Sequence, residues 1–251
     1  MQNILVFLPF MKVEMRLKKL IFILFIIPIG LYAQKPKAWN KPLYDVYPYH
    51  FGFAFSFGVL DFSVKHSDYF LNQNPDSIFS VEGIAKPLFG ASMVTNLRLT
   101  ENLDLRFIPG LYFGQRDLNY LHIPETGTTD TSMHTMKIES TFLQFPLLFK
   151  YRSTRENNYR PYLVFGASYG IDLAARKKIK QEEMPKIRLQ RHDIFLEMGA
   201  GIDYYLPFFK FSTELRFSYG LMNVVSYDNT KYTRVYDKLG SKMVTLVIYF
   251  E

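Results

Sequence analysis

The sequence has no cysteine among its 251 residues and only one tryptophan. Without cysteine there can be neither a disulfide framework nor a thiolate metal site. After Tyr49 no apolar run is long enough to cross a bilayer as a helix, because such a span needs roughly 20 residues. Disulfide-stapled folds and thiolate-bound zinc are therefore excluded, and so is a bundle of membrane helices after Tyr49.

Catalytic and cofactor motifs are also missing. The five histidines form neither a metal-binding pair at i, i+4 nor an HExxH motif, and there is no glycine-rich phosphate loop. His122 and His134 share one long loop, where a solvated role is favoured over a metal site. His192 beside Asp193 is the nearest candidate for a catalytic pair, because it falls at the end of an expected strand. We expect no cofactor, no metal, no small-molecule substrate and no enzymatic activity.

The formal net charge of +7 raises nucleic acid as a partner. The basic residues do not form a stripe with interleaved aromatic residues, so we expect no nucleic-acid binding. An anionic membrane surface that carries lipopolysaccharide suits a basic chain at least as well. Aromatic residues make up 17% of the sequence, with 24 Phe and 18 Tyr, and this favours β-structure.

The segment from Met15 to Ala33 reads MRLKKLIFILFIIPIGLYA. A basic start, an apolar run from Leu20 to Ile29 and a small residue at the end are the three parts of a secretory signal peptide. The run is too short for a membrane-spanning helix. We interpret residues 1–33 as a signal peptide, with Met15 as the candidate true start of translation. Residues 34–49 are then an extended, proline-broken periplasmic lead-in.

Alternation with a period of two recurs along the rest of the chain and predicts strands. We expect eight of them, near residues 50–60, 89–99, 103–116, 139–152, 159–172, 192–205, 209–221 and 242–251. Their connections alternate between long and short, as in outer-membrane barrels with long extracellular loops and short periplasmic turns. The predicted fold is all-β: an eight-stranded antiparallel up-and-down transmembrane β-barrel over residues 50–251, with both chain ends in the periplasm.

Each predicted strand has one bulky, uncharged face and one face that carries the charges and most glycines. In the stretch HFGFAFSFG at residues 50–58, phenylalanine takes every second position. The interior of an eight-stranded barrel is just wide enough for side chains to fill it, so the bulky face must point outward. Lipid tolerates such a surface and water does not. The residues predicted to face lipid are Phe51, Phe53, Phe55, Phe57, Phe107, Phe145, Phe165 and Phe217.

The inward face carries charges of both signs. Because an unpaired buried charge is costly, we expect a ladder of salt bridges inside the barrel. A proton or substrate path is the alternative interpretation of the same residues. The predicted interior charge network contains Arg98, Asp104, Arg106, Glu197, Asp203, Glu214 and Arg216. Pro109 and Pro146 fall within expected strands and predict either bulges or the membrane rim.

The long connection before residue 192 is strongly basic. We predict either a loop that binds an acidic glycan or a protein partner, or a solvated loop near anionic headgroups. Its basic residues are Arg176, Lys177, Lys178, Lys180, Lys186 and Arg188.

Several segments carry a family resemblance. YHFGFAFSFGVLDFSV, NLRLTENLDLRFIPGLYFGQRDLNY, IESTFLQFPLLFKYRS, NNYRPYLVFGASYGIDL and FKFSTELRFSYGLMN occur in this order between Tyr49 and Asn223. Together they resemble the PorT (SprT) family of the Bacteroidetes, and the likeness extends over nearly all of the chain from Tyr47 to Phe250. The resemblance implies an outer-membrane barrel that type IX protein secretion requires, and gliding motility where it is present. It supplies no catalytic motif.

Three functions therefore remain open. The first is a non-enzymatic assembly or structural component of type IX secretion, with other secretion components as partners. The second is a stand-alone surface barrel or adhesin that binds ligands through its loops. The third is a lipid-modifying enzyme at the barrel rim. In every case the expected location is the outer membrane, in contact with its lipid and lipopolysaccharide.

Overall fold

The computed structural model describes residues 39–73, 78–122, 132–175, 187–226 and 233–251. The chain divides into two compact units, Met1–Trp39 and Asn40–Glu251. All of the described strands belong to the second unit. The expected signal peptide lies outside the described residues and stays a prediction. Within the described ranges, no helix is long and apolar enough to cross a membrane.

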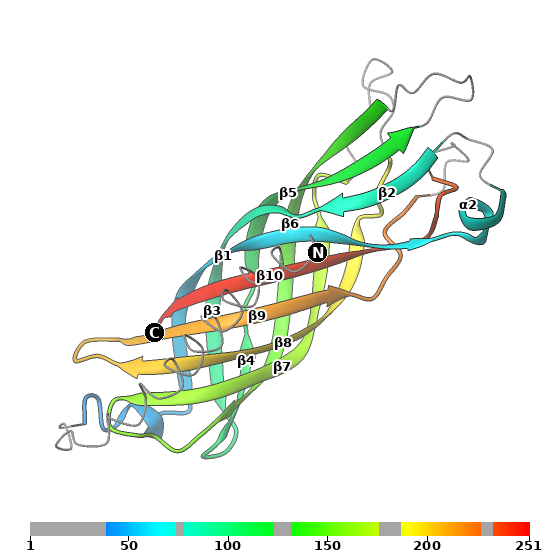
Figure 1. Cartoon of the computed structure of the whole chain (residues 1–251). Coiled ribbons are helices and arrows are strands. Elements are labelled where there is room, and N and C mark those ends of the chain that lie inside the picture. Colours follow the sequence, from blue (N-terminus) through cyan, green and yellow to red (C-terminus); the bar gives the residue numbers. More distant parts are fainter. Residues whose placement is uncertain (1–38, 74–77, 123–131, 176–186, 227–232) are drawn as a thin grey trace, which may run out of the picture. The chain divides into compact units, whose positions relative to one another are not determined.

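The second unit is almost entirely one antiparallel sheet that closes on itself (Figure 1). Two short helices accompany the strands, η2 (Tyr44–Val46) and α2 (Asp68–Gln73). The ring closes because β1 pairs with both β10 and β3. The strands are β1 (Tyr49–His66), β2 (Ile78–Ile84), β3 (Lys86–Arg98), β4 (Leu103–Phe107), β5 (Gly110–His122), β6 (Ser132–Arg152), β7 (Tyr159–Asp172), β8 (His192–Tyr205), β9 (Lys210–Gly220) and β10 (Tyr236–Phe250).

Strands β4 and β5 are two halves of one barrel strand. Both halves pair with β3 on one side and β6 on the other. Among the described residues, β2 pairs with β5 alone. The closed ring therefore has eight strands, and the predicted up-and-down barrel is confirmed.

The break between β4 and β5 falls where two prolines meet. Pro109 lies in the break, and Pro146 lies opposite it on β6, where its carbonyl accepts a hydrogen bond of 3.0 Å from the Ile108 N–H. Proline has no N–H to donate, so the ladder loses bonds on both strands here. The register is unchanged across the gap, since Phe107 pairs with Leu147 and Gly110 with Gln144. Of the two predicted interpretations of these prolines, the bulge is wrong, because pairing is interrupted without an inserted residue; the membrane rim stays a prediction.

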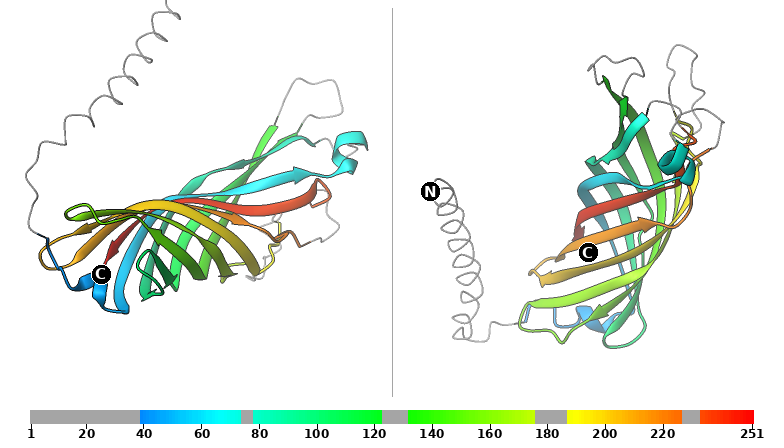
Figure 2. Two further views of the ribbon diagram at one scale, coloured as in Figure 1. Left: turned by 90° about the horizontal axis from the view of Figure 1, so that it is seen from below. Right: turned by 45° about the vertical axis from the view of Figure 1, so that its right-hand side comes forward.

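The two ends of the barrel differ. We call the end with the short connections 99–102, 153–158 and 206–209 the turn end, and the opposite end the loop end. At the loop end several strands run beyond their predicted limits: β1 continues to His66, and β6 and β10 begin at Ser132 and Tyr236 (Figure 2). Inward side chains of these strands, with others from β2, β5 and the connecting residues at this end, form an apolar core that we call the loop-end cluster. Its members are Phe62, Val81, Leu118, Tyr120, Met136, Ile187, Leu189, Val224, Val225, Val235, Tyr236 and Leu239.

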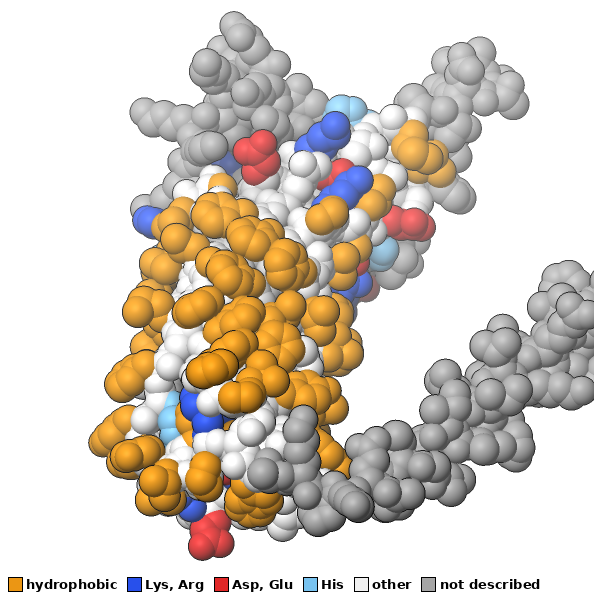
Figure 3. Space-filling model, turned by 90° about the vertical axis from the view of Figure 1, so that its left-hand side faces the viewer, with side chains coloured by type: hydrophobic (Ala, Val, Ile, Leu, Met, Phe, Trp, Pro, Cys, Tyr) orange, Lys and Arg blue, Asp and Glu red, His pale blue; other side chains and the backbone are white. Residues whose placement is uncertain are grey.

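The outer face of the barrel carries the large apolar side chains. Phe51 is 69% exposed and Phe55 is 38% exposed. Of the other residues predicted to face lipid, Phe53, Phe57, Phe107, Phe165 and Phe217 are also exposed, and Phe145 is half-buried. Figure 3 shows the apolar side chains gathered in a broad band over one face of the barrel, with charged side chains beyond the band.

The inward face holds more than charges and glycines. Two apolar clusters lie inside the ring, one around Tyr162 and Tyr249 and the other around Phe142 and Phe195. Glycines make room for the rings: a Cβ on Gly90 would lie 2.5 Å from the ring of Tyr112, and one on Gly170 would lie 2.7 Å from Phe195. The barrel interior is therefore a packed core, as expected for eight strands.

Candidate functional site

The turn-end half of the interior is built around Arg106. Its guanidinium donates to Glu251 at 2.9 Å and to Asn96 at 3.3 Å, and it lies 3.5 Å from a carboxylate oxygen of Glu214. The ring of Tyr249 lies 4.6 Å beneath it. Arg106, Glu214 and Glu251 have fully buried side chains, so each charge is balanced by its neighbours and not by water.

Glu214 connects this group to a second arginine. Its carboxylate accepts hydrogen bonds from the hydroxyls of Tyr162 and Tyr249, each at 3.0 Å. Arg216 donates to the same carboxylate from Nε at 2.8 Å, and it pairs with Glu197 at 3.3 Å. One carboxylate thus receives donors from β7, β9 and β10, which ties non-adjacent strands together.

A further ion pair joins β6 to β8. Lys150 Nζ donates to both carboxylate oxygens of Asp203, each at 2.7 Å, and Ser212 donates to the same group at 2.6 Å. The ammonium lies 3.7 Å from the centre of the Tyr162 ring. This fully buried pair is satisfied on both sides.

The structure brings together six of the seven residues predicted for the interior charge network. Arg98 is the exception. It lies half-buried at the turn end and donates to the backbone carbonyls of Thr100 and Asp45. The six buried members are Asp104, Arg106, Glu197, Asp203, Glu214 and Arg216.

Two further members come from the ends of strands. Glu251 lies just after β10 and forms ion pairs with Arg106 and Lys210. It continues the inward alternation of Val247 and Tyr249, and the predicted strand 242–251 already included it, so alternation alone could have placed it inside. Lys210, at the start of β9, shares the same face.

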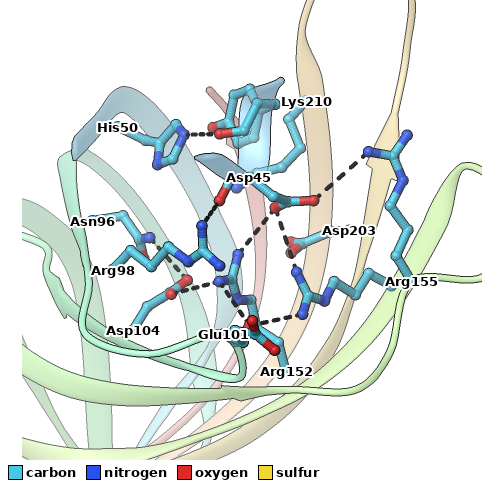
Figure 4. Close-up of polar contacts among 12 residues, drawn as sticks. Asp45, His50, Asn96, Arg98, Glu101, Asp104, Arg152, Arg155, Asp203 and Lys210 are labelled. Atoms are coloured by element: carbon cyan, nitrogen blue, oxygen red, sulfur yellow. Dashed lines mark hydrogen bonds and ion pairs between the residues drawn. The ribbon is translucent and has the colours of Figure 1, made fainter. Parts of the chain in front are cut away.

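Sequence reasoning missed the mouth of the barrel at the turn end. Of the predicted lead-in, residues 34–49, we keep the name lead-in for residues 40–48, which contain the turn η2 and are not extended throughout. Asp45, in this turn, faces Arg152 and Arg155 (Figure 4), and Arg160 from the same β6–β7 region also pairs with it. Its carboxylate lies 3.1 Å from Arg152, 3.7 Å from Arg155 and 3.4 Å from Arg160, and it accepts a hydrogen bond of 2.9 Å from the Tyr205 hydroxyl.

Tyr44 makes the second contact between the lead-in and the barrel. Its ring stacks on His50 with centroids 4.0 Å apart, and its hydroxyl donates to Glu251 at 3.2 Å. Burial raises the pKa of the Tyr44 hydroxyl, and the neighbouring Glu251 carboxylate raises this pKa further. The hydroxyl therefore stays protonated and acts as a donor at any physiological pH.

The loop-end half has its own buried arginine. Arg116 pairs with Asp172 at 3.2 Å, donates to Ser140 and Ser241 at 3.0 and 2.7 Å, and lies 4.3 Å from the Phe62 ring. This group therefore adjoins the loop-end cluster, to which Phe62 belongs.

The candidate catalytic pair, His192 and Asp193, is not brought together. His192 and Asp193 point to opposite faces of β8: the aspartate is buried inside, whereas His192 is exposed outside and hydrogen-bonded to the Tyr169 hydroxyl at 2.7 Å. No group of three metal-ligating side chains occurs among the described residues. His134 is exposed, and the side chain of His122 lies outside the described part of the chain.

The predicted partner-binding loop is mostly outside the described residues. Of its basic residues only Arg188 is described, and its side chain is exposed. Its carbonyl accepts a hydrogen bond of 3.0 Å from the Ser226 N–H, which fixes the end of this loop beside the loop-end cluster.

The comparison with family models agrees with the closed ring and its apolar outer face. Residues 32–226 match the model described as outer membrane protein beta-barrel domain. The chain belongs to this family. Its location is therefore the outer membrane, where the apolar band of the outer face contacts lipid. A search of curated protein sequences finds no significant match.

Solved structures that resemble the chain are remote in sequence. Neisserial surface protein A is 12% identical, over 81% of this chain and 99% of that chain, with a TM-score of 0.41. The outer membrane protein OprG from Pseudomonas aeruginosa is 14% identical over 79% and 92%, with a TM-score of 0.40. Ail, the attachment invasion locus protein of Yersinia pestis, is 13% identical over 79% and 97%, with a TM-score of 0.31. These similarities are too distant to transfer a function.

Proposed function

We propose that this barrel is a non-enzymatic component of type IX protein secretion that acts in assembly or as a structural part. The resemblance to the PorT family is the reason for naming this system. The packed interior is the observation that supports a structural role, because apolar clusters and paired charges from all eight barrel strands occupy the space that a conduit would need.

The proposal includes an orientation. The turn end and the lead-in face the periplasm, and the loop end faces the outside, since outer-membrane barrels have short periplasmic turns. In this orientation, the lead-in lies on the side from which a chain exported by a signal peptide reaches the outer membrane. Other secretion components are the proposed partners, together with the lipid and lipopolysaccharide of the membrane.

The test is deletion of the gene, followed by a comparison of cargo proteins in the culture medium with those retained in the periplasm. We expect cargo to be lost from the medium and restored by the wild-type gene. A second complementing gene carries Gln in place of the six basic residues from Arg176 to Arg188. If the wild-type gene restored export and this variant did not, the basic loop would be identified as the partner-binding element. Normal export in the deletion strain would overturn the proposal.

A stand-alone surface barrel is the second candidate, and the loop-end cluster favours it. Strands β1, β5, β6 and β10 continue beyond the apolar band and enclose an apolar core, which gives the loops a rigid base. The same deletion strain separates the two functions: loss of surface binding with normal export would support the adhesin. The rim enzyme has less support, because His192 and Asp193 lie on opposite faces of β8.

A further inference from the structure

Three arginines at the turn end converge on the single carboxylate of Asp45. They come from the last residue of β6, from the β6–β7 turn and from the start of β7, and the Tyr205 hydroxyl on β8 completes the set (Figure 4). A planar guanidinium is the side chain best suited to bind a carboxylate, so this arrangement has the chemistry of a carboxylate receptor.

The barrel itself holds these arginines in position. Arg152 donates to Glu101 O at 3.3 Å and pairs with Asp104 at 2.9 Å. Arg160 donates to the backbone carbonyls of Ser153 and Glu101 at 2.6 and 2.9 Å. These partners lie on the strands and turns of the barrel and not on the lead-in. The two guanidinium groups would therefore keep their places if the lead-in moved away.

Arg155 is fixed in a similar way. It donates to the carbonyl of Asn157 at 2.9 Å, and its guanidinium stacks on the Tyr205 ring at 3.6 Å. It also donates to the carbonyl of Asn40, in the lead-in, at 2.5 Å. Without Asp45, the three guanidinium groups would remain at the mouth beside the carboxylate of Asp104, which pairs with Arg152. Loss of the Asp45 carboxylate would therefore make the mouth more positive by one charge.

The lead-in is attached through hydrogen bonds and through the ring of Tyr44, which stacks on His50. Asn40, Tyr44 and Asp45 make hydrogen bonds to the barrel. Its apolar side chains point away: Leu43 is 63% exposed and Val46 is 65% exposed. A permanent plug would bury such side chains, whereas a segment held by its carboxylate can be exchanged for another that carries the same group.

We propose that the turn-end mouth is a binding site for the carboxylate of an acidic peptide segment in a partner protein, and that Asp45 occupies this site as an internal ligand. Partner binding would replace Asp45 and release the lead-in. The site is a property of the mouth alone and does not depend on a role in secretion.

The test uses the full chain in detergent micelles with Asp45→Asn, which removes the internal carboxylate. The probe is a fluorescent peptide of residues 40–48, NKPLYDVYP, with an amidated C-terminus, and its control is the same amidated peptide with Asn in place of Asp. Because the tethered Asp45 competes at an effective concentration in the millimolar range, we expect the variant to bind the acidic peptide at least about tenfold more tightly than the wild type does. The control peptide should bind neither protein.

Two further variants assign the binding to the arginines. Adding Arg155→Gln to Asp45→Asn should abolish peptide binding, whereas adding Arg234→Gln, an exposed arginine at the loop end, should leave it unchanged. Equal binding of both peptides, or equal affinity in the wild type and in Asp45→Asn, would overturn the proposal. Displacement of the peptide by millimolar acetate supports a carboxylate site. A site that binds inorganic phosphate but not the acidic peptide would be a headgroup site and would also overturn it.

A second measurement does not need a vacated site. The chain has no cysteine, so Leu43→Cys accepts a single spin label on the exposed side of the lead-in. In otherwise wild-type protein the label should gain mobility when the acidic peptide is added in excess, and it should not respond to the control peptide. An unchanged spectrum at saturating acidic peptide would contradict displacement of the lead-in.

Discussion

Arg106 and Glu251 form an ion pair of 2.9 Å in which neither side chain has any solvent exposure. Arg106 lies on β4, and Glu251 follows β10, and these strands are not neighbours in the ring. The pair therefore crosses the interior and connects the closing strand to the opposite wall. Since Glu251 also pairs with Lys210, its one carboxylate balances two buried cations.

Glu251→Gln should be strongly destabilising. The substitution keeps the volume of the side chain but leaves Arg106 and Lys210 without their carboxylate, and breaking a buried pair in this way costs about 3–5 kcal/mol. The free energy of unfolding in urea, measured in lipid vesicles, tests this. The matched control is Glu82→Gln, since Glu82 is exposed on β2 and should tolerate the change. Equal stability of both variants would show that the network contributes nothing to the fold.

Phe55→Arg should cost about 2–4 kcal/mol, because the residue lies on the outer face near the middle of the apolar band and would carry its charge into lipid. Met133→Arg is the control: Met133 is 67% exposed near the start of β6, at the loop end. Its substitution should leave stability nearly unchanged. Heat-modifiable migration on gels and urea unfolding report both effects. If Phe55→Arg left the free energy of unfolding unchanged, this face would not be in contact with lipid.

Gly90→Val should destabilise by overpacking, at a cost of about 1–3 kcal/mol. The nearest atoms to a Cβ at this position all belong to the ring of Tyr112, starting at 2.5 Å. Tyr112→Ala alone should also destabilise, because it leaves a cavity in the interior cluster. In the double variant the valine at position 90 occupies the space that the Tyr112 ring leaves, so the loss of stability should be smaller than the sum of the losses in the two single variants. Simple additivity would contradict the direct contact.

His192→Ala should leave the lipid A profile and the proteolytic activity of cells unchanged. The imidazole is exposed on the outer face and is hydrogen-bonded to Tyr169, while Asp193 is buried on the inner face. Mass spectrometry of lipid A and a protease assay in a strain that carries the variant provide the measurement. A change in lipid A that the wild-type gene reverses would restore the rim enzyme as a function.

The strands and their faces were predictable because a barrel repeats one local rule along every strand. Outward Phe53 and inward Ala54 differ by one position, so alternation alone assigns each residue a side. The ends of the strands were harder to predict from the sequence. Asp61 and Lys65 on the outer face interrupt the apolar alternation of β1, so the predicted strand ended too early. The strand in fact continues, and its inward Phe62 packs into the loop-end cluster.

The mouth could not be predicted, since it depends on pairs far apart in the chain. Asp45 and Arg152 are separated by 107 positions, and neither carries a local pattern that marks the other. The prolines around Asp45 also indicated an extended lead-in. Only the closed ring brings the ends of β6, β7 and β8 to the place where the lead-in crosses.

The pairing of β1 with β10 also sets the order in which the barrel can form. Phe53 pairs with Phe250 and Leu60 with Met243, so the seam joins the first and last strands of the sheet. Until β10 has arrived, β1 keeps an unpaired edge whose N–H and C=O groups hydrocarbon cannot solvate. Such non-local pairing is slow. Closure in the bilayer must therefore wait for export of all eight barrel strands, and an incomplete chain would need protection from aggregation on its way to the membrane.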